Sequence, residues 1–191
     1  MKKFFAGIAV AIFAGSTASA ATISGTSATP EGLVPIVEEF RTALGGLNPN
    51  TPTNEAPGGR RQIKWDAAPD ALSDPHAFPG DFFNFSAAPR ARGIEFTPTG
   101  STTGFQLSST EASGEPTAFG RPNSFVPFSQ ERMFTPIGGN TFDVTFFNPV
   151  DQTTPATTRG LGVVFNDVED EGDTCMEIFD IAGNLIDSQV V

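Results

Sequence analysis

The sequence predicts an all-β fold, a β-sandwich of jelly-roll type with one short helix near its N-terminus. Short stretches in which apolar and polar residues alternate recur through the second two-thirds of the chain, each bounded by glycine, proline or serine. The 191 residues include 20 glycines and 16 prolines, which suits short strands joined by many turns. The only helical periodicity lies before residue 46, so strands are expected to build the core.

The first twenty residues have the three parts of a secretory signal peptide. Lys2 and Lys3 are basic, residues 4–14 are apolar, and small residues precede Ala20. We therefore predict cleavage near Ala20 and a protein that is secreted, periplasmic or held at the cell surface; an uncleaved amphipathic anchor is the alternative. The apolar run is shorter than a membrane span of about 20 residues and no later stretch replaces it, so no membrane insertion of the mature chain is expected.

Composition disfavours several functional classes. The chain has 22 acidic and 11 basic residues and a net charge of -11, and it lacks the clustered Lys and Arg that bind phosphates, so nucleic acid is not an expected partner. One histidine, His76, and one cysteine leave little stock for zinc sites, and no Gly-x-Ser-x-Gly turn supports a hydrolase triad. Cys175 alternates with Glu177 and Phe179, which predicts that it faces the core.

Residues 21–58 are expected to comprise a flexible arm, a short helix and a loop. Residues 21–30 are small and polar, which predicts the arm. Apolar side chains then follow at helical spacing, namely Leu33, Ile36, Val37, Phe40 and Leu44. Gly45 and Gly46 provide a C-terminal stop, and the apolar stripe predicts packing on a sheet. Residues 48–58 have no periodicity and predict a loop.

The β-sandwich domain is predicted to span residues 59–191. Alternation predicts strands at residues 62–65, 93–97, 104–108, 141–147 and 160–166, and a terminal hairpin of residues 174–180 and 185–191. Residues 66–92 contain four prolines and four phenylalanines, which predicts an irregular loop held by buried rings. The last strand runs to Val191 without a polar tail, which raises the alternative that the domain is truncated at its C-terminus.

Residues spread over most of the mature chain carry a family resemblance. They are the run Gly-Arg-Arg-Gln-Ile-Lys-Trp-Asp at 59–66, Pro69, Asp70, residues 81–84, Arg90, Gly93, Phe96 and residues 160–165. This pattern resembles a family of secreted bacterial proteins of unassigned function, some of which carry a PEP-CTERM sorting tail. The resemblance implies an exported β-rich domain and assigns no catalytic residue. This sequence has no Pro-Glu-Pro tail, so the resemblance does not extend to surface sorting.

The densest acidic group is predicted to lie between two strands. Its candidate ligands are Asn166, Asp167, Glu169, Asp170 and Asp173. Calcium takes six to eight oxygen ligands, so this density of carboxylate and amide oxygens makes the group a candidate Ca²⁺ site. The favoured interpretation is a solvated acidic loop that keeps a sheet edge from pairing with a neighbour.

A second acidic group surrounds the only tryptophan. Trp65 would provide a ring platform, and the carboxylates of Asp66 and Asp70 would bind hydroxyl groups, an arrangement typical of sugar sites. Asp74 and Asp81 extend this set, so a glycosidase using a pair of carboxylates is the enzymatic alternative. Since Trp65 is the largest apolar side chain, a core or half-buried place is the favoured interpretation for it, and Asp66 would then cap a turn.

These observations favour an exported, non-enzymatic module that binds a ligand or serves a structural role at the envelope or outside the cell. Carbohydrate, as a glycan or an envelope polymer, is the favoured ligand because jelly-roll sandwiches often bind sugars, which is an analogy of fold. A hydrolase that acts on polysaccharide through an acidic pair and a purely structural surface domain are the alternatives.

Overall fold

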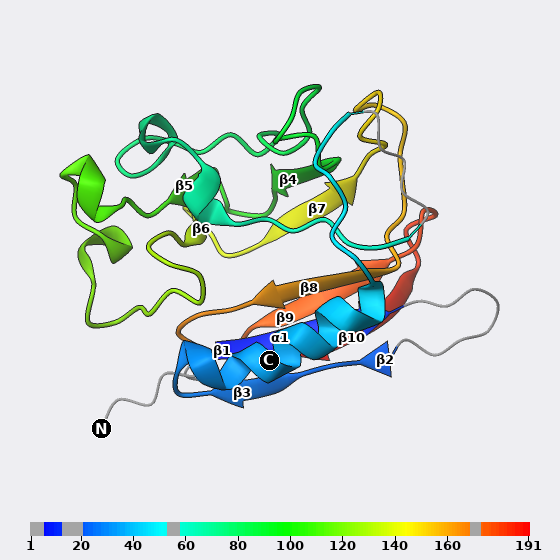
Figure 1. Ribbon diagram of the computed structural model, residues 1–191, viewed down its shortest axis with the longest axis horizontal. Coiled ribbons are helices and arrows are strands. Elements are labelled where there is room, and N and C mark those ends of the chain that lie inside the picture. Colours follow the sequence, from blue (N-terminus) through cyan, green and yellow to red (C-terminus); the bar gives the residue numbers. More distant parts are fainter. Residues whose placement is uncertain (1–5, 13–20, 53–57, 169–172) are drawn as a thin grey trace. The chain divides into compact units, whose positions relative to one another are not determined.

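The computed structural model describes residues 6–12, 21–52, 58–168 and 173–191. Its helix and strands are labelled in Figure 1. The chain forms two compact units, each assembled from segments that are distant in sequence. Unit 1 comprises residues 1–46, 124–128 and 158–191, and unit 2 comprises residues 47–123 and 129–157. Among the described residues, no helix is long and apolar enough to cross a membrane.

Unit 1 contains an antiparallel sheet and a separate hairpin. The sheet is formed by β1 (Ala6–Ile12), β2 (Ala21–Thr22), β3 (Gly25–Ser27) and β8 (Gly160–Val164). β1 is the shared strand, since β8, β2 and β3 all pair with it. The hairpin consists of β9 (Cys175–Phe179) and β10 (Leu185–Val190), which confirms the predicted C-terminal hairpin.

Residues 21–27 differ from the predicted flexible arm. They form β2 and β3, because their backbone pairs with β1 and because Ile23 packs beside Leu33 and Val37 of the helix. A run of small polar residues gives no sign of such pairing, since strand formation depends on the neighbouring strand more than on intrinsic preference. β1 lies within residues 1–20, for which the sequence predicts a cleavable signal, and export stays a prediction.

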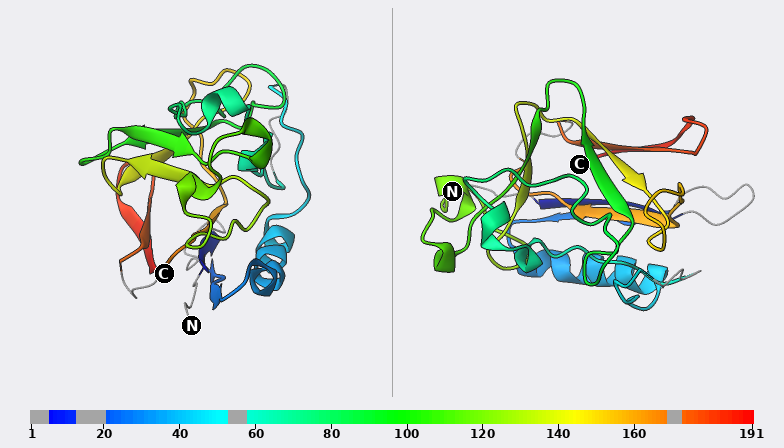
Figure 2. Two further views of the ribbon diagram at one scale, coloured as in Figure 1. Left: turned by 90° about the vertical axis from the view of Figure 1, so that its left-hand side faces the viewer. Right: turned by 90° about the horizontal axis from the view of Figure 1, so that it is seen from above.

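The predicted helix is confirmed as α1 (Pro30–Leu44), and its apolar stripe is buried as expected. Leu33 is fully buried and Val37 is 9% exposed, with Ile36 and Phe40 packed beside them. The right-hand view of Figure 2 shows α1 lying along one face of the sheet. Gly162 of β8 permits this approach, because a Cβ atom there would lie 2.5 Å from the Phe40 ring.

Unit 2 is built from two small antiparallel ladders and several tight turns. The ladders are β4 (Ile94–Pro98) with β7 (Phe142–Phe146), and β5 (Gly104–Leu107) with β6 (Phe134–Ile137). The 3-10 turns are η1 (Trp65–Ala67), η2 (Asp70–Leu72), η3 (Glu111–Ser113) and η4 (Ala118–Gly120). The predicted strand at 62–65 is wrong: residues 61–64 form no strand, and Trp65 opens η1.

An aromatic cluster forms the core of unit 2. It consists of Trp65, Phe78, Phe82, Phe83, Phe96, Phe105, Phe134 and Phe142. Three of these rings come from the loop 66–92, which confirms that buried phenylalanines hold that loop in place. Phe85 is the exception, since it is 41% exposed.

The β-rich character predicted from the sequence is confirmed, with one α-helix among the described residues. The sheets are small and do not close on one another. The jelly-roll arrangement stays a prediction.

Candidate functional site

Two of the predicted sugar-binding residues, Asp66 and Asp70, lie on consecutive tight turns of unit 2. Asp66 belongs to η1 and Asp70 opens η2. Pro69, with its fixed φ, separates the turns and allows each to close with its own backbone bond, from Ala68 N–H to the Trp65 carbonyl at 3.0 Å and from Leu72 N–H to the Pro69 carbonyl at 2.9 Å. The turns therefore place the two carboxylates on one short, ordered segment.

Arg132 joins the two carboxylates. Its backbone N–H donates to Asp66 Oδ1 at 2.9 Å, and its Nη2 forms an ion pair with Asp70 Oδ1. Its Nη1 also donates to the Pro69 carbonyl at 3.4 Å. The Arg132 side chain is 2% exposed and that of Asp70 is 51% exposed, so the guanidinium holds the Asp70 carboxylate from the buried side, while the Arg132 backbone holds Asp66. Charge-assisted bonds of this kind are stronger than neutral ones and fix geometry.

The position of Arg132 depends on the backbone that leads into β6. Glu131 adopts a left-handed φ of 72°, which bends the chain just before Arg132. Ser108, fully buried, braces the bend: its hydroxyl donates to the Glu131 carbonyl at 3.2 Å and accepts from Met133 N–H at 2.8 Å. Arg132 is thus set by a segment more than sixty residues from the two aspartates.

Trp65 lies in the aromatic cluster. Its ring stacks on Phe134 with centroids 4.6 Å apart and an interplanar angle of 9°, so one face of the indole is covered. Phe78, Phe83 and Phe96 pack around the same ring at centroid distances of 5.8–6.0 Å. This half-buried position agrees with the core alternative for Trp65 and leaves the aspartates as the exposed part of the predicted site.

The two aspartates present unused acceptors to solvent. Each uses Oδ1 for its contacts with Arg132, and Thr110 Oγ1 adds a weak bond to Asp70 Oδ1 at 3.4 Å. Within the part of the chain that the structure describes, the Oδ2 atom of neither aspartate has a hydrogen-bond partner. Asp74 is not part of this pair, because its Oδ1 accepts from Gln106 Nε2 at 3.1 Å.

The predicted calcium ligands are only partly described. Glu169 and Asp170 lie outside the described residues. Asp167 has a left-handed φ of 63°, Asp173 is exposed, and the Asn166 amide donates to the Val126 carbonyl. Within the described ranges, no three His, Cys, Asp or Glu side chains are grouped in a way that could hold a metal ion. Calcium binding at this loop stays a prediction.

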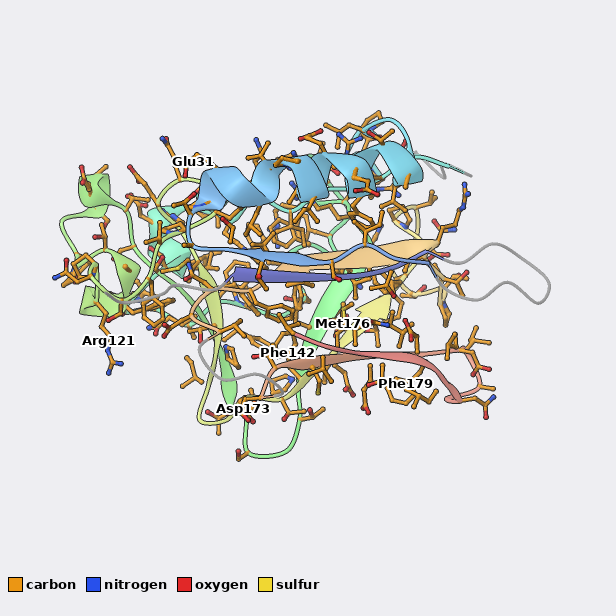
Figure 3. The ribbon with its side chains drawn as sticks, turned by 90° about the horizontal axis from the view of Figure 1, so that it is seen from below. Glu31, Arg121, Phe142, Asp173, Met176 and Phe179 are labelled. Carbon is orange, nitrogen blue, oxygen red and sulfur yellow. The ribbon has the colours of Figure 1, made fainter. Side chains whose placement is uncertain are left out.

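Cys175 differs from the sequence expectation. It is a free and exposed thiol on β9, opposite Val190 of β10, whereas the alternation predicted a core position. Met176, 8% exposed and labelled in Figure 3, is the buried residue of β9, and the half-buried Ile178 shares its face. Alternation fixes which residues share a face of a strand but not which face is buried. In β9 the buried face is the one opposite to that predicted.

No family model, curated protein or solved structure matches the chain.

Arg132 is the residue of this site that the sequence pattern did not indicate. An isolated arginine before an unpredicted strand carries no local signal, because its role depends on contacts that only the folded chain creates.

Proposed function

We propose that the protein is an exported, non-enzymatic binding module and that Asp66 and Asp70 bind carbohydrate hydroxyl groups. The observation that carries the proposal is the pair of exposed carboxylates that Arg132 holds from the buried side. Binding sites use a few precisely placed polar groups to fix a ligand, and groups already ordered before binding lose less entropy. The free Oδ2 atoms are suited to accept hydrogen bonds from neighbouring hydroxyls of a sugar.

The same contacts favour binding over hydrolysis. A glycosidase needs one carboxylic acid that gives a proton to the leaving group and a second carboxylate that acts as nucleophile or base. Asp70 is ion-paired with a buried arginine, and Asp66 accepts a backbone N–H, so each carboxylate is engaged as an acceptor. This arrangement suits the recognition of hydroxyl groups by carboxylate acceptors.

The proposal also includes export of the protein and a jelly-roll fold. The signal-like residues 1–20 and the resemblance to secreted bacterial proteins support export. A jelly-roll arrangement would place the protein among sandwich folds that often bind sugars, although function resides in the site and not in the fold. The β-rich architecture of the described residues is compatible with this assignment.

The test is a glycan array probed with the protein that a bacterial host exports from the full-length gene. Its mass reports whether residues 1–20 have been removed. The array is probed with Ca²⁺ and with a chelator, and the supernatant is analysed for released sugars. Selective retention supports the proposal. Sugar release would establish the hydrolase instead, and absence of both retention and release would leave a structural domain.

The double variant Asp66→Asn with Asp70→Asn tests the site. Asparagine retains an Oδ1 acceptor for Arg132 but replaces the free Oδ2 with a donor, so retention should fall by about tenfold or more, the value of a lost charged hydrogen bond. The matched control is Asp143→Asn on β7, an exposed aspartate with no hydrogen-bond partner among the described residues. Equal retention by the double variant and the wild type, with unchanged melting temperatures, would place the site elsewhere.

A further inference from the structure

Arg90 and Arg92 lie together on an ordered bend at the end of the loop 66–92. Ala91 between them forms a bridge with Asn84. The Arg92 N–H donates to the Phe83 carbonyl at 2.9 Å, which ties the segment to the aromatic cluster. The two arginines are therefore held on fixed backbone two residues apart.

The Arg90 guanidinium is oriented without being neutralised. Its Nε donates to the Phe82 carbonyl at 2.8 Å, and its central carbon lies 4.1 Å from the Phe82 ring centroid and 3.8 Å from that of Phe85. These contacts use the rings and the Nε edge. Nη1 and Nη2 have no hydrogen-bond partner among the residues described, so the fork that binds carboxylates bidentately remains available.

Arg92 is oriented in the same way. Its Nε donates to the Gln62 carbonyl at 3.0 Å, its Nη1 donates to the Pro89 carbonyl at 2.8 Å, and its guanidinium lies 4.4 Å from the Phe83 ring centroid. Desolvation by burial lowers the pKa of Arg92 to about 10, which still leaves the group charged at neutral pH. Nη2 has no partner in the described part of the chain.

Neither arginine forms an ion pair with a described residue, although the chain has twice as many acidic as basic residues. Between two described residues, the ion pairs are Arg41 with Glu38 and Arg132 with Asp70. Carbonyl and ring contacts fix the orientation of a guanidinium but leave its charge uncompensated. Two cations with fixed, unused donors are what an anionic ligand group requires.

We propose that Arg90 and Arg92 form a subsite for a carboxylate group, carried by a uronic acid residue of an acidic glycan. The planar, bidentate geometry of guanidinium matches a carboxylate. Phe85, 41% exposed beside Arg90, provides apolar surface for the sugar ring. That the carboxylate belongs to a glycan rests on the proposed function, whereas carboxylate binding by the two arginines does not.

The net charge of -11 opposes the approach of an anion but does not remove the subsite. At about 0.15 M ionic strength the Debye length is about 8 Å, so distant carboxylates are screened while direct guanidinium contacts persist. Binding to the subsite should therefore be measured at this ionic strength and with a monosaccharide that carries a single negative charge.

The probe is glucuronate, added to ¹⁵N-labelled exported protein, and the readout is the Nε–H resonances of Arg90 and Arg92. Its methyl ester keeps the sugar ring and removes the charge. Saturable shifts with glucuronate and none with the ester are expected. Equal shifts with both ligands, no shift with glucuronate, or tighter binding of inorganic sulfate would overturn the assignment to a carboxylate.

The variant Arg90→Lys retains the charge but loses the planar fork, so glucuronate affinity should fall by about tenfold or more. The control is Arg121→Lys, which changes an exposed arginine that extends away from the ribbon (Figure 3) and has no side-chain partner among the described residues. Equal losses in the two variants would show that the loss is not specific to Arg90 and would overturn the proposal. The acid–ester comparison uses the unaltered chain and stays decisive if Arg90→Lys does not fold.

The glucuronate titration and the glycan array together distinguish failure of the carboxylate subsite from failure of the proposed carbohydrate binding. Retention of neutral glycans that depends on Asp66 and Asp70, without a glucuronate shift, removes the subsite and leaves the proposed function. A glucuronate shift at Arg90 and Arg92 without retention on the array supports the carboxylate subsite and removes its assignment to a glycan.

Discussion

Replacing Phe134 with alanine should destabilise unit 2 more than any change at an exposed ring. Phe134 stacks on Trp65 at 4.6 Å and on Phe105 at 5.1 Å, and packs on Phe96 at 5.0 Å. Burial of a phenylalanine ring contributes about 2–3 kcal/mol, and ring pairs add about 0.5–1.5 kcal/mol each but not additively. Phe134→Ala should therefore lower the free energy of unfolding by about 3–5 kcal/mol.

The assay is urea and thermal unfolding followed by the fluorescence of Trp65, the only tryptophan, which reports on the cluster itself. For a chain of this size the expected fall in melting temperature is about 6–20 °C. Phe85→Ala is the comparison, because its ring is 41% exposed and contacts the Arg90 guanidinium, so about 1 kcal/mol or less is expected. Equal losses in the two variants would refute the assignment of the core to the aromatic cluster.

Two further predictions follow from the turns. Gly93→Ala should cost more than Gly100→Ala, because both positions have positive φ but a Cβ at Gly93 would lie 2.1 Å from the Phe147 carbonyl oxygen while Gly100 has open space, and comparing urea midpoints checks this order. In the terminal hairpin, hydrogen bonds from the Asn184 side chain and then its backbone N–H lower the pKa of Asp180. The stability that they contribute is present above the ordinary aspartate pKa and is lost as pH falls through the lowered one, so amide-exchange protection of the hairpin should weaken in acid. In Asp180→Asn this acid dependence should disappear; its persistence would assign it to another group.

The sequence predicted those elements whose evidence is local. The stripe beginning at Leu33 and the stop at Gly45 predicted α1, and alternation predicted β4, β5, β7, β8 and the hairpin to within two residues at each boundary. In these segments the apolar periodicity and the turn residues lie in the same short stretch of chain. Burial then follows the pattern, as for Phe142 and Val144 on one face of β7.

Elements that depend on distant partners could not be predicted in this way. β6 contains Pro136 and lacks a clear alternation, and it forms because β5 pairs with it. β2 and β3 exist through their pairing with β1. The run 62–65 alternates like a strand, yet residues 61–64 pair with no strand and Trp65 instead turns its ring into the cluster. In each case tertiary pairing decides over local preference.

The candidate site shows the same division. Asp66 and Asp70 could be selected from the sequence because acidic residues beside the only tryptophan are conspicuous. Arg132 could not be selected, since its contact with Asp70 spans 62 positions of the chain. The sequence also carried no sign that Arg90 and Arg92 have no ion-pair partner among the described residues, because it shows two arginines but not the carbonyl groups that orient them.

The interleaving of the two units has a consequence for how the chain is made. The last segment of unit 2 ends at residue 157, whereas unit 1 includes residues up to 191. Domains generally fold as they emerge during synthesis, from the N-terminus onward. Unit 1 cannot complete its sheet until β8 has been synthesised, although its first segment begins the chain. Unit 2 should therefore be the first of the two units to fold. A chain stopped after residue 157 would therefore contain every segment of unit 2 while the apolar stripe of α1 remained without Val164, its partner from β8.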